Sequence, residues 1–167
     1  MTLQALISED DLAVQSFLQT LLQSQNFAVQ CTGSGQTALQ ILSSQSYDLV
    51  LLDLQMPGSH GYSTLIHLRS HYPELPVIVI SAHEDINTIS RAIHYGGSGF
   101  IPKSASMETL KEALTAVLCG DLWLPKGADI IPIEDDSTDK MASKLSDLTP
   151  QQYKVLQMFA EGLLNKQ

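Results

Sequence analysis

Short apolar runs alternate with longer segments of helical periodicity along the first two thirds of the chain. The run at residues 49–52 is apolar without polar alternation, as expected for a strand buried on both faces of a parallel sheet. Similar runs predict further strands at residues 3–8, 27–31, 77–80 and 99–102. The pattern therefore predicts a sheet of five short strands.

A helix is predicted after each strand, because apolar residues there recur at helical spacing. The helices are expected over residues 12–25, around 38–42, around 62–68, around 86–93 and over 106–118. Gly96 and Gly97 predict a left-handed cap at the end of the fourth helix, and Met107 is expected on the inner face of the fifth. Five β-α units predict one doubly wound α/β domain.

The periodic pattern ends after Pro125. Residues 126–147 contain Pro132 and an acidic triplet, a composition that predicts a flexible acidic linker. A new helix is predicted within residues 148–167, where Thr149 fits an N-cap and Pro150 the first helical position.

Composition narrows the function classes. The 167 residues carry a formal net charge of -9, which argues against nucleic-acid binding by the bulk of the chain. There is no membrane-length apolar run and no signal peptide, so we expect a cytoplasmic protein. Cys31 and Cys119 stand alone and are expected to be buried free thiols.

Polar residues whose side chains could take part in catalysis or ligand binding follow four of the predicted strands. Parallel strands bring their carboxyl ends together at one edge of the sheet, where open α/β sheets bind ligands. Asp53 is expected there in an open, solvated position, since a buried carboxylate is costly and Pro57 turns the chain soon afterwards. The residues expected to face one crevice are Glu9, Asp10, Asp53, Ser81 and Lys103.

This set predicts phosphoryl-transfer chemistry. Three carboxylates beside one ammonium repel one another unless a divalent cation is present, and an all-oxygen site suits Mg2+. A carboxylate nucleophile, a hydroxyl and a lysine complete the groups that such a transfer needs. His67 and His71 share one helix face, but no third ligand is evident near them, so no metal site is expected there.

Over residues 1 to about 120 the chain closely resembles the receiver domain of two-component response regulators. The resemblance implies a flavodoxin-like fold with strand order 2-1-3-4-5. It also implies that Mg2+ is held by Glu9, Asp10, Asp53 and the backbone carbonyl of Gln55. The other family positions fall on Asp53 as phosphoacceptor, Lys103 as its partner, Ser81 and Phe100 as the switch pair, and Pro57 and Gly58 after the acceptor.

Three positions depart from the commonest receiver pattern. Glu9 replaces an aspartate, Phe100 replaces a frequent tyrosine, and Ser104 follows the lysine where many receivers have proline. None of these changes removes a required group. Gln55 and His83 are expected near the phosphoryl group, where they would influence how fast water attacks it.

Residues 120–125 resemble the end of the receiver in one class of these regulators, and residues 148–156 with 160–166 resemble the start of its helix-turn-helix domain. This second resemblance is to the NarL/LuxR class. It divides the chain into a receiver at 1–125, a linker at 126–147 and the start of a helix-turn-helix domain at 148–167. The recognition helix of that class lies beyond Gln167, so DNA is expected to be bound only through a missing C-terminal part. The resemblance further implies a sensor histidine kinase as phosphodonor, a homodimer, and a regulator rather than a turnover enzyme.

Two rival functions remain. A haloacid-dehalogenase-like phosphatase also uses an aspartate at a strand end with Mg2+, but it needs a second aspartate two residues later, where this chain has Gln55. A receiver-shaped interaction scaffold would work without phosphorylation. Such scaffolds usually lack part of the acidic cluster or the lysine, and this chain has both.

Overall fold

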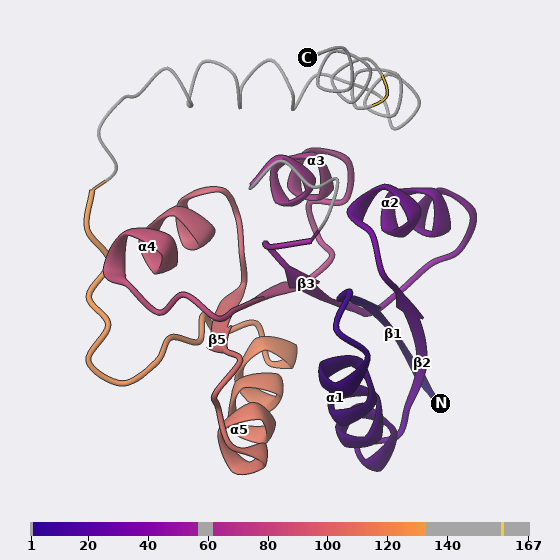
Figure 1. Ribbon diagram of the computed structural model, residues 1–167, viewed down its shortest axis with the longest axis horizontal. Coiled ribbons are helices and arrows are strands. Elements are labelled where there is room, and N and C mark those ends of the chain that lie inside the picture. The colour runs from indigo at the N-terminus through magenta and orange to yellow at the C-terminus, as the bar shows by residue number, and fades with distance from the viewer. Residues whose placement is uncertain (1, 57–61, 133–157, 159–167) are drawn as a thin grey trace.

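The computed structural model describes residues 2–56, 62–132 and 158. Within them, five strands pair in parallel and form one sheet in the order β2-β1-β3-β4-β5 (Figure 1). The predicted doubly wound sheet and its strand order are thereby confirmed. The strands are β1 Leu3–Ser8, β2 Phe27–Thr32, β3 Leu49–Asp53, β4 Val77–Ser81 and β5 Gly99–Pro102.

Helices cover both faces of the sheet. Figure 1 shows α2, α3 and α4 on one face and α1 and α5 on the other. Every residue of β3 and β4 is buried, as their unbroken apolar runs predict for central strands of a parallel sheet. The helices are α1 Leu12–Ser24, α2 Gly35–Ser44, α3 Ser63–His71, α4 Ile86–His94 and α5 Met107–Leu118.

Side-chain caps fix where four of these helices begin. Asp11, Ser34, Asp85 and Ser106 each occupy an N-cap position and accept hydrogen bonds from backbone N–H groups in the first turn. After α4, Gly96 has φ +106°, so the predicted left-handed turn is confirmed at that residue. These caps set the short turns that lead from the strand ends into α1 and α4.

The predicted burial of Met107 and of the two cysteines is wrong. Met107 is 41% exposed, because it is the first residue of α5 and the buried residues of that helix begin only at Leu110. Cys119 is exposed and Cys31 only partly buried, since Cys119 follows the last turn of α5 and Cys31 lies on an edge strand. Both cysteines are free thiols, as expected.

The chain continues in contact with the domain after α5. Trp123 forms a parallel bridge with Gly99 of β5, and the backbone N–H of Ile131 donates to Ser90 Oγ of α4 at 3.0 Å. Residues 126–132, predicted as the start of a flexible linker, therefore lie against the α/β domain. Residues 57–61 and most of 133–167, including the predicted helix-turn-helix start, lie outside the described residues.

None of the helices in the described part of the chain is both long and apolar enough to cross a membrane.

Candidate functional site

The structure assembles the predicted polar residues at one edge of the sheet. Asp53 and Ser81 are the last residues of β3 and β4. The register pairs Asp53 with Ile80 and Ser81 with Pro102, so the ends of β3, β4 and β5 stand side by side. Glu9 follows β1 and Lys103 follows β5, which places their side chains at the same edge.

Lys103 joins the two buried carboxylates. Its Nζ lies 3.0 Å from Asp53 Oδ2 and within 3.0 to 3.1 Å of the two carboxylate oxygens of Glu9. In sequence, Lys103 is 50 positions from Asp53 and 94 positions from Glu9, so only the folded sheet brings these residues into contact.

Asp53 is 1% exposed, so the prediction that it is open to solvent is wrong. Burial is tolerated because both of its carboxylate oxygens have partners. Oδ2 contacts the Lys103 ammonium, and Oδ1 accepts the backbone N–H of Gln55 at 3.0 Å. Charge pairing and these hydrogen bonds offset the cost of removing the carboxylate from water.

The Glu9 carboxyl is also inaccessible to solvent. Burial raises its pKa from the ordinary 4.5 to about 7, against the opposing effects of the Asp11 N–H hydrogen bond and Lys103, and the nearby Asp53 charge raises it further. For Lys103, burial alone would lower the pKa, but the bonds and charges of Asp53 and Glu9 raise it overall. The lysine is therefore held firmly as a cation.

The carboxylates of Glu9, Asp10 and Asp53 form a cluster in which one oxygen from each lies within 4.8 Å of the others. Glu9 and Asp53 are buried, whereas Asp10 is exposed and borders solvent. Three hard oxygen donors with one side open to water match the preference of Mg2+ for few carboxylates and several waters. The donor set fits that cation.

Ser81 and Phe100 occupy the neighbouring strands. Ser81 is 1% exposed, and its Oγ accepts the backbone N–H of His83 at 3.1 Å. Phe100 is fully buried in the core between the sheet and the α2–α4 layer. His83 and Gln55 are exposed at the site, where their backbone N–H groups serve Ser81 and Asp53.

Two supporting contacts were not predicted from the sequence. Gln15 donates from its side chain to the backbone carbonyl of Glu9 and, at 3.4 Å, to that of Thr32, which ties α1 to the turn that carries the acids. Ser104 donates to Glu84 at 2.5 Å and so links the loops that follow β4 and β5. Glutamine on a helix and serine in a loop carry no distinguishing sequence signal.

Comparison with known proteins gives a consistent family. A sequence model of the response regulator receiver domain matches residues 5–115. A glycerol metabolism activator of Pseudomonas putida is 38% identical over 128 residues, covering 72% of this chain and 57% of that protein. The transcriptional activator protein ExaE of Pseudomonas putida is 30% identical over 132 residues, covering 78% of this chain and 62% of that protein.

A candidate transcriptional regulator of Pseudomonas aeruginosa is 29% identical over 164 residues, which cover 98% of this chain and 79% of that protein. Among solved structures, a LuxR family DNA-binding response regulator from Silicibacter pomeroyi has a TM-score of 0.66 and 29% identity, covering 75% of this chain and 98% of that one. The isolated receiver domain of RcsB from Salmonella enterica has a TM-score of 0.68 at 19% identity, covers 75% of this chain and 95% of its own, and shows the shared fold.

Proposed function

Because the chain belongs to the response regulator receiver family, we propose that Asp53 accepts a phosphoryl group from a sensor histidine kinase and that the adduct controls transcription. The observation that carries this proposal is the contact between the buried Asp53 carboxylate, which belongs to the three-carboxylate cluster, and the Lys103 ammonium. The alternative from another class is a receiver-shaped scaffold that acts without phosphorylation.

The chemistry divides among residues of this chain. A carboxylate oxygen of Asp53 attacks phosphorus, and its O–P bond forms as the P–N bond of the donor phosphohistidine breaks and the imidazole leaves. Lys103 then shifts from the Asp53 carboxylate to a phosphoryl oxygen. Mg2+ held by Glu9, Asp10, Asp53 and the Gln55 carbonyl would supply charge neutralisation for the transferring oxygens.

Ser81 and Phe100 change their positions in response to phosphorylation of Asp53. The Ser81 hydroxyl, which now accepts the His83 N–H, turns to donate to a phosphoryl oxygen. Phe100 then repacks toward the space that Ser81 has vacated. The two packings form a two-state element whose populations the phosphoryl group shifts. We assign Gln55 and His83, exposed beside the acceptor, an influence on water attack and thus on adduct lifetime.

The output is proposed to be transcriptional regulation of the NarL/LuxR type. Support comes from the Pseudomonas aeruginosa relative, whose match extends through 98% of this chain and so includes most of the C-terminal segment. The LuxR family neighbour at 29% identity points to the same class. DNA binding would be performed by a domain that begins near residue 148, with the adduct promoting homodimerisation or releasing that domain, in the cytoplasm.

The test is intact mass spectrometry after incubation with a small phosphodonor, with and without Mg2+. We expect one added phosphoryl group that requires Mg2+ and is lost in Asp53→Asn. Asp48→Asn is the matched control, because Asp48 is an exposed aspartate at the opposite end of β3. Its adduct should equal that of the wild type.

Folded protein that forms no adduct with any donor would overturn the phosphorylation mechanism and favour the scaffold. An adduct that persists in Asp53→Asn would place the acceptor elsewhere. Each result is read together with circular dichroism of the same samples, so that loss of the adduct cannot be confused with loss of the fold.

A further inference from the structure

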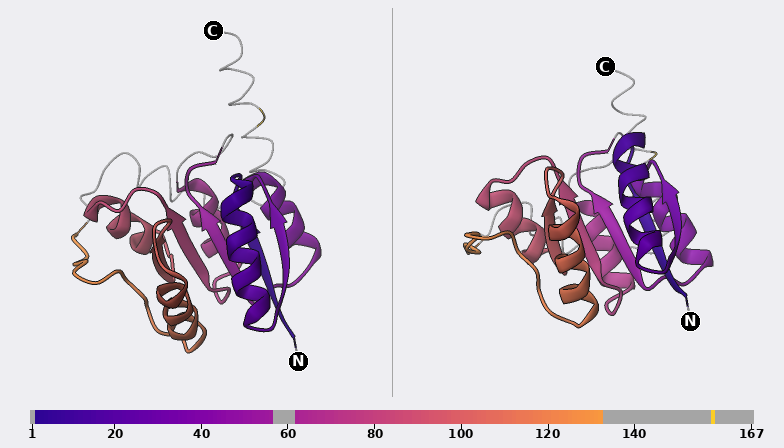
Figure 2. Two further views of the ribbon diagram at one scale, coloured as in Figure 1. Left: turned by 60° about the horizontal axis from the view of Figure 1, so that its bottom comes forward. Right: turned by 90° about the horizontal axis from the view of Figure 1, so that it is seen from below.

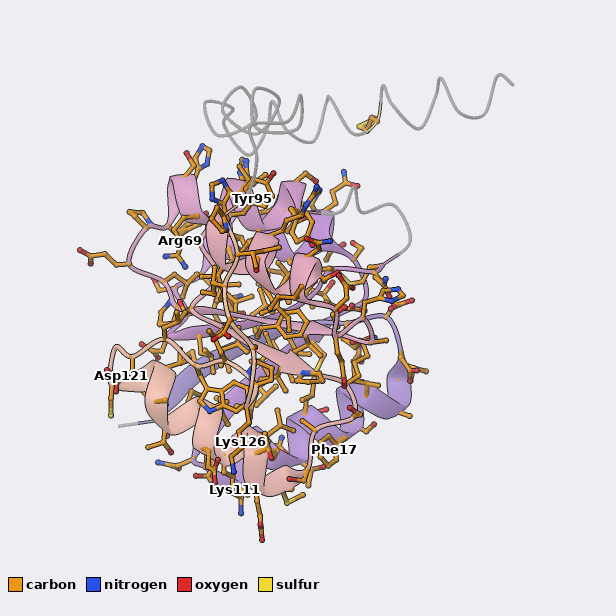
Figure 3. All side chains as sticks on the ribbon, turned by 90° about the vertical axis from the view of Figure 1, so that its left-hand side faces the viewer. Phe17, Arg69, Tyr95, Lys111, Asp121 and Lys126 are labelled. Carbon is orange, nitrogen blue, oxygen red and sulfur yellow. The ribbon has the colours of Figure 1, made fainter. Side chains whose placement is uncertain are left out.

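The segment after α5 forms a connection between β5 and α4 that the proposed phosphorylation mechanism does not use. We call residues 122–132 the strap. Figure 1 shows it leaving α5, passing β5 and reaching α4, and the two views of Figure 2 show the same course. Figure 3 looks onto this side of the molecule, with Lys126 of the strap and Tyr95 at the end of α4 labelled.

The first anchor of the strap is on β5. The backbone N–H of Phe100 donates to the Trp123 carbonyl at 3.2 Å, and the Trp123 N–H donates to the Ser98 carbonyl at 3.3 Å. Gly99 permits this approach, since a Cβ there would lie 3.3 Å from the Trp123 carbonyl oxygen and 3.2 Å from a methyl of Val117. Trp123 also packs on the core beneath α5.

The second anchor is on α4. The Ile131 N–H donates to Ser90 Oγ at 3.0 Å, and Ser90 is fully buried. Between the anchors, Leu124 and Ala128 pack against the core cluster that contains Phe100. At one end, the strap thus contacts the backbone of Phe100, one of the two proposed switch residues. At the other end it contacts α4, the helix that follows Ser81, the second switch residue.

The link from the phosphorylation site to the second anchor is short. The Ser81 hydroxyl accepts the His83 N–H, and Asp85, the N-cap of α4, lies only two residues further along. If Ser81 turns to the phosphoryl group, His83 loses its acceptor and the loop that holds the start of α4 is released. Ser90 lies on that helix, so a movement of α4 would affect its contact with Ile131 before any other contact of the strap.

We propose that the strap is an internal ligand of the unphosphorylated receiver, and that phosphorylation of Asp53 detaches its α4 anchor while its β5 anchor stays in place. The anchors differ in strength. Two backbone hydrogen bonds and a packed indole hold Trp123, whereas one bond to a side chain holds Ile131. This inference rests on the proposed function and adds to it a route by which the signal reaches the residues after Pro132.

The test uses the whole chain and amide hydrogen exchange resolved by NMR. Beryllofluoride with Mg2+ serves as a stable stand-in for the phosphoryl group. We expect the Ile131 amide to exchange about threefold to tenfold faster with beryllofluoride, the range set by one net hydrogen bond, while the Trp123 amide keeps its protection. Unchanged exchange at Ile131 in protein that has bound beryllofluoride would overturn the proposal, and so would equal loss of protection at Trp123.

Two variants remove the α4 anchor from opposite sides. Ser90→Ala deletes the acceptor, and Ile131→Pro deletes the donor. Both should accelerate exchange at Ala128 in the unphosphorylated protein, and the double variant should add nothing further, since the partners share one bond. Asn87→Ala, an exposed change in the same helix, is the control. Additive effects of the two changes would show that they do not act through one contact.

Linkage gives an independent readout. If the intact anchor favours the unphosphorylated state, its loss must raise the affinity for beryllofluoride by up to the same threefold to tenfold. Unchanged affinity in both variants would overturn the regulatory role. The exchange effect of Ser90→Ala without beryllofluoride does not depend on phosphorylation, so failure of the proposed function and failure of the strap proposal are distinguishable.

Discussion

Two aspartates flank the same strand and have different surroundings. Asp48 precedes β3, is exposed, and accepts the Gln4 N–H through Oδ2 at 2.8 Å. Asp53 ends β3, is 1% exposed, and faces the Lys103 ammonium. The residue type and the strand are the same, so the chemistry of Asp53 comes from what the other strands bring to its edge of the sheet.

The largest expected effect comes from removing Lys103, the cation that lies beside Asp53 and not beside Asp48. Lys103→Met should slow phosphorylation by a small donor about 100-fold, because a pre-positioned charge that stabilises the transferring oxygens is lost. The measurement is the initial rate of adduct formation by mass spectrometry at saturating Mg2+. Lys111→Met removes an exposed lysine of α5 and should leave the rate unchanged. A loss below threefold in Lys103→Met would remove Lys103 from the transfer step.

His67 of α3 is a buried ionisable residue outside the site, and it extends the comparison to the effect of burial on an imidazole. Burial, with a smaller effect of the adjacent His71, lowers the pKa of His67 from 6.5 to about 4. The folded state therefore resists a proton that the unfolded state accepts. The contribution of His67 to the free energy of unfolding is greatest above about pH 6.5. It falls by roughly 2 to 3 kcal/mol as the pH drops toward 4.

We expect His67→Gln to flatten the dependence of unfolding free energy on pH between 6.5 and 4, as measured by urea denaturation. The comparison uses the slope, so a lower absolute stability of the variant does not affect it. Gln40→Ala replaces an exposed residue that does not titrate and should keep the wild-type slope. An unchanged slope in His67→Gln would mean that His67 is protonated in the folded protein.

A smaller effect is expected from the cation that the acidic cluster fits. Mg2+ at ten times its dissociation constant should stabilise the folded chain by about 1.4 kcal/mol, measured as a shift in thermal unfolding. Asp10→Asn should lose most of this gain. Asp11→Asn should retain it, since asparagine also caps a helix and Asp11 serves α1 as its N-cap. Equal stabilisation of both variants would exclude Asp10 from the metal site.

The arrangement of the strand ends could be predicted because it follows from connectivity. Apolar runs mark the strands, and parallel β-α units place Asp53, Ser81 and Lys103 at one edge. The same reasoning failed on the burial of Asp53. Burial depends on the Lys103 ammonium that pairs with the carboxylate, and this contact joins strand ends 50 positions apart, whose packing no local pattern encodes.

The docking of residues 126–132 was missed for a related reason. Proline, glycine and charged residues in that stretch favour a linker by composition. The contacts that hold it are the Ile131 N–H bond to Ser90 and the packing of Ala128. Neither has a periodic signature. Composition indicates the conformation that an isolated segment prefers, whereas the strap is held in place by contacts with other elements of the fold.

The position of Trp123 also matters for solubility. β5 lies at one end of the sheet, and an unpaired edge strand offers backbone groups to which another chain can add. The Trp123 backbone occupies two of these groups, at Ser98 and Phe100. A chain cut at Gly120 would keep the five strands and the acidic cluster, yet it would uncover that edge and should self-associate through strand pairing.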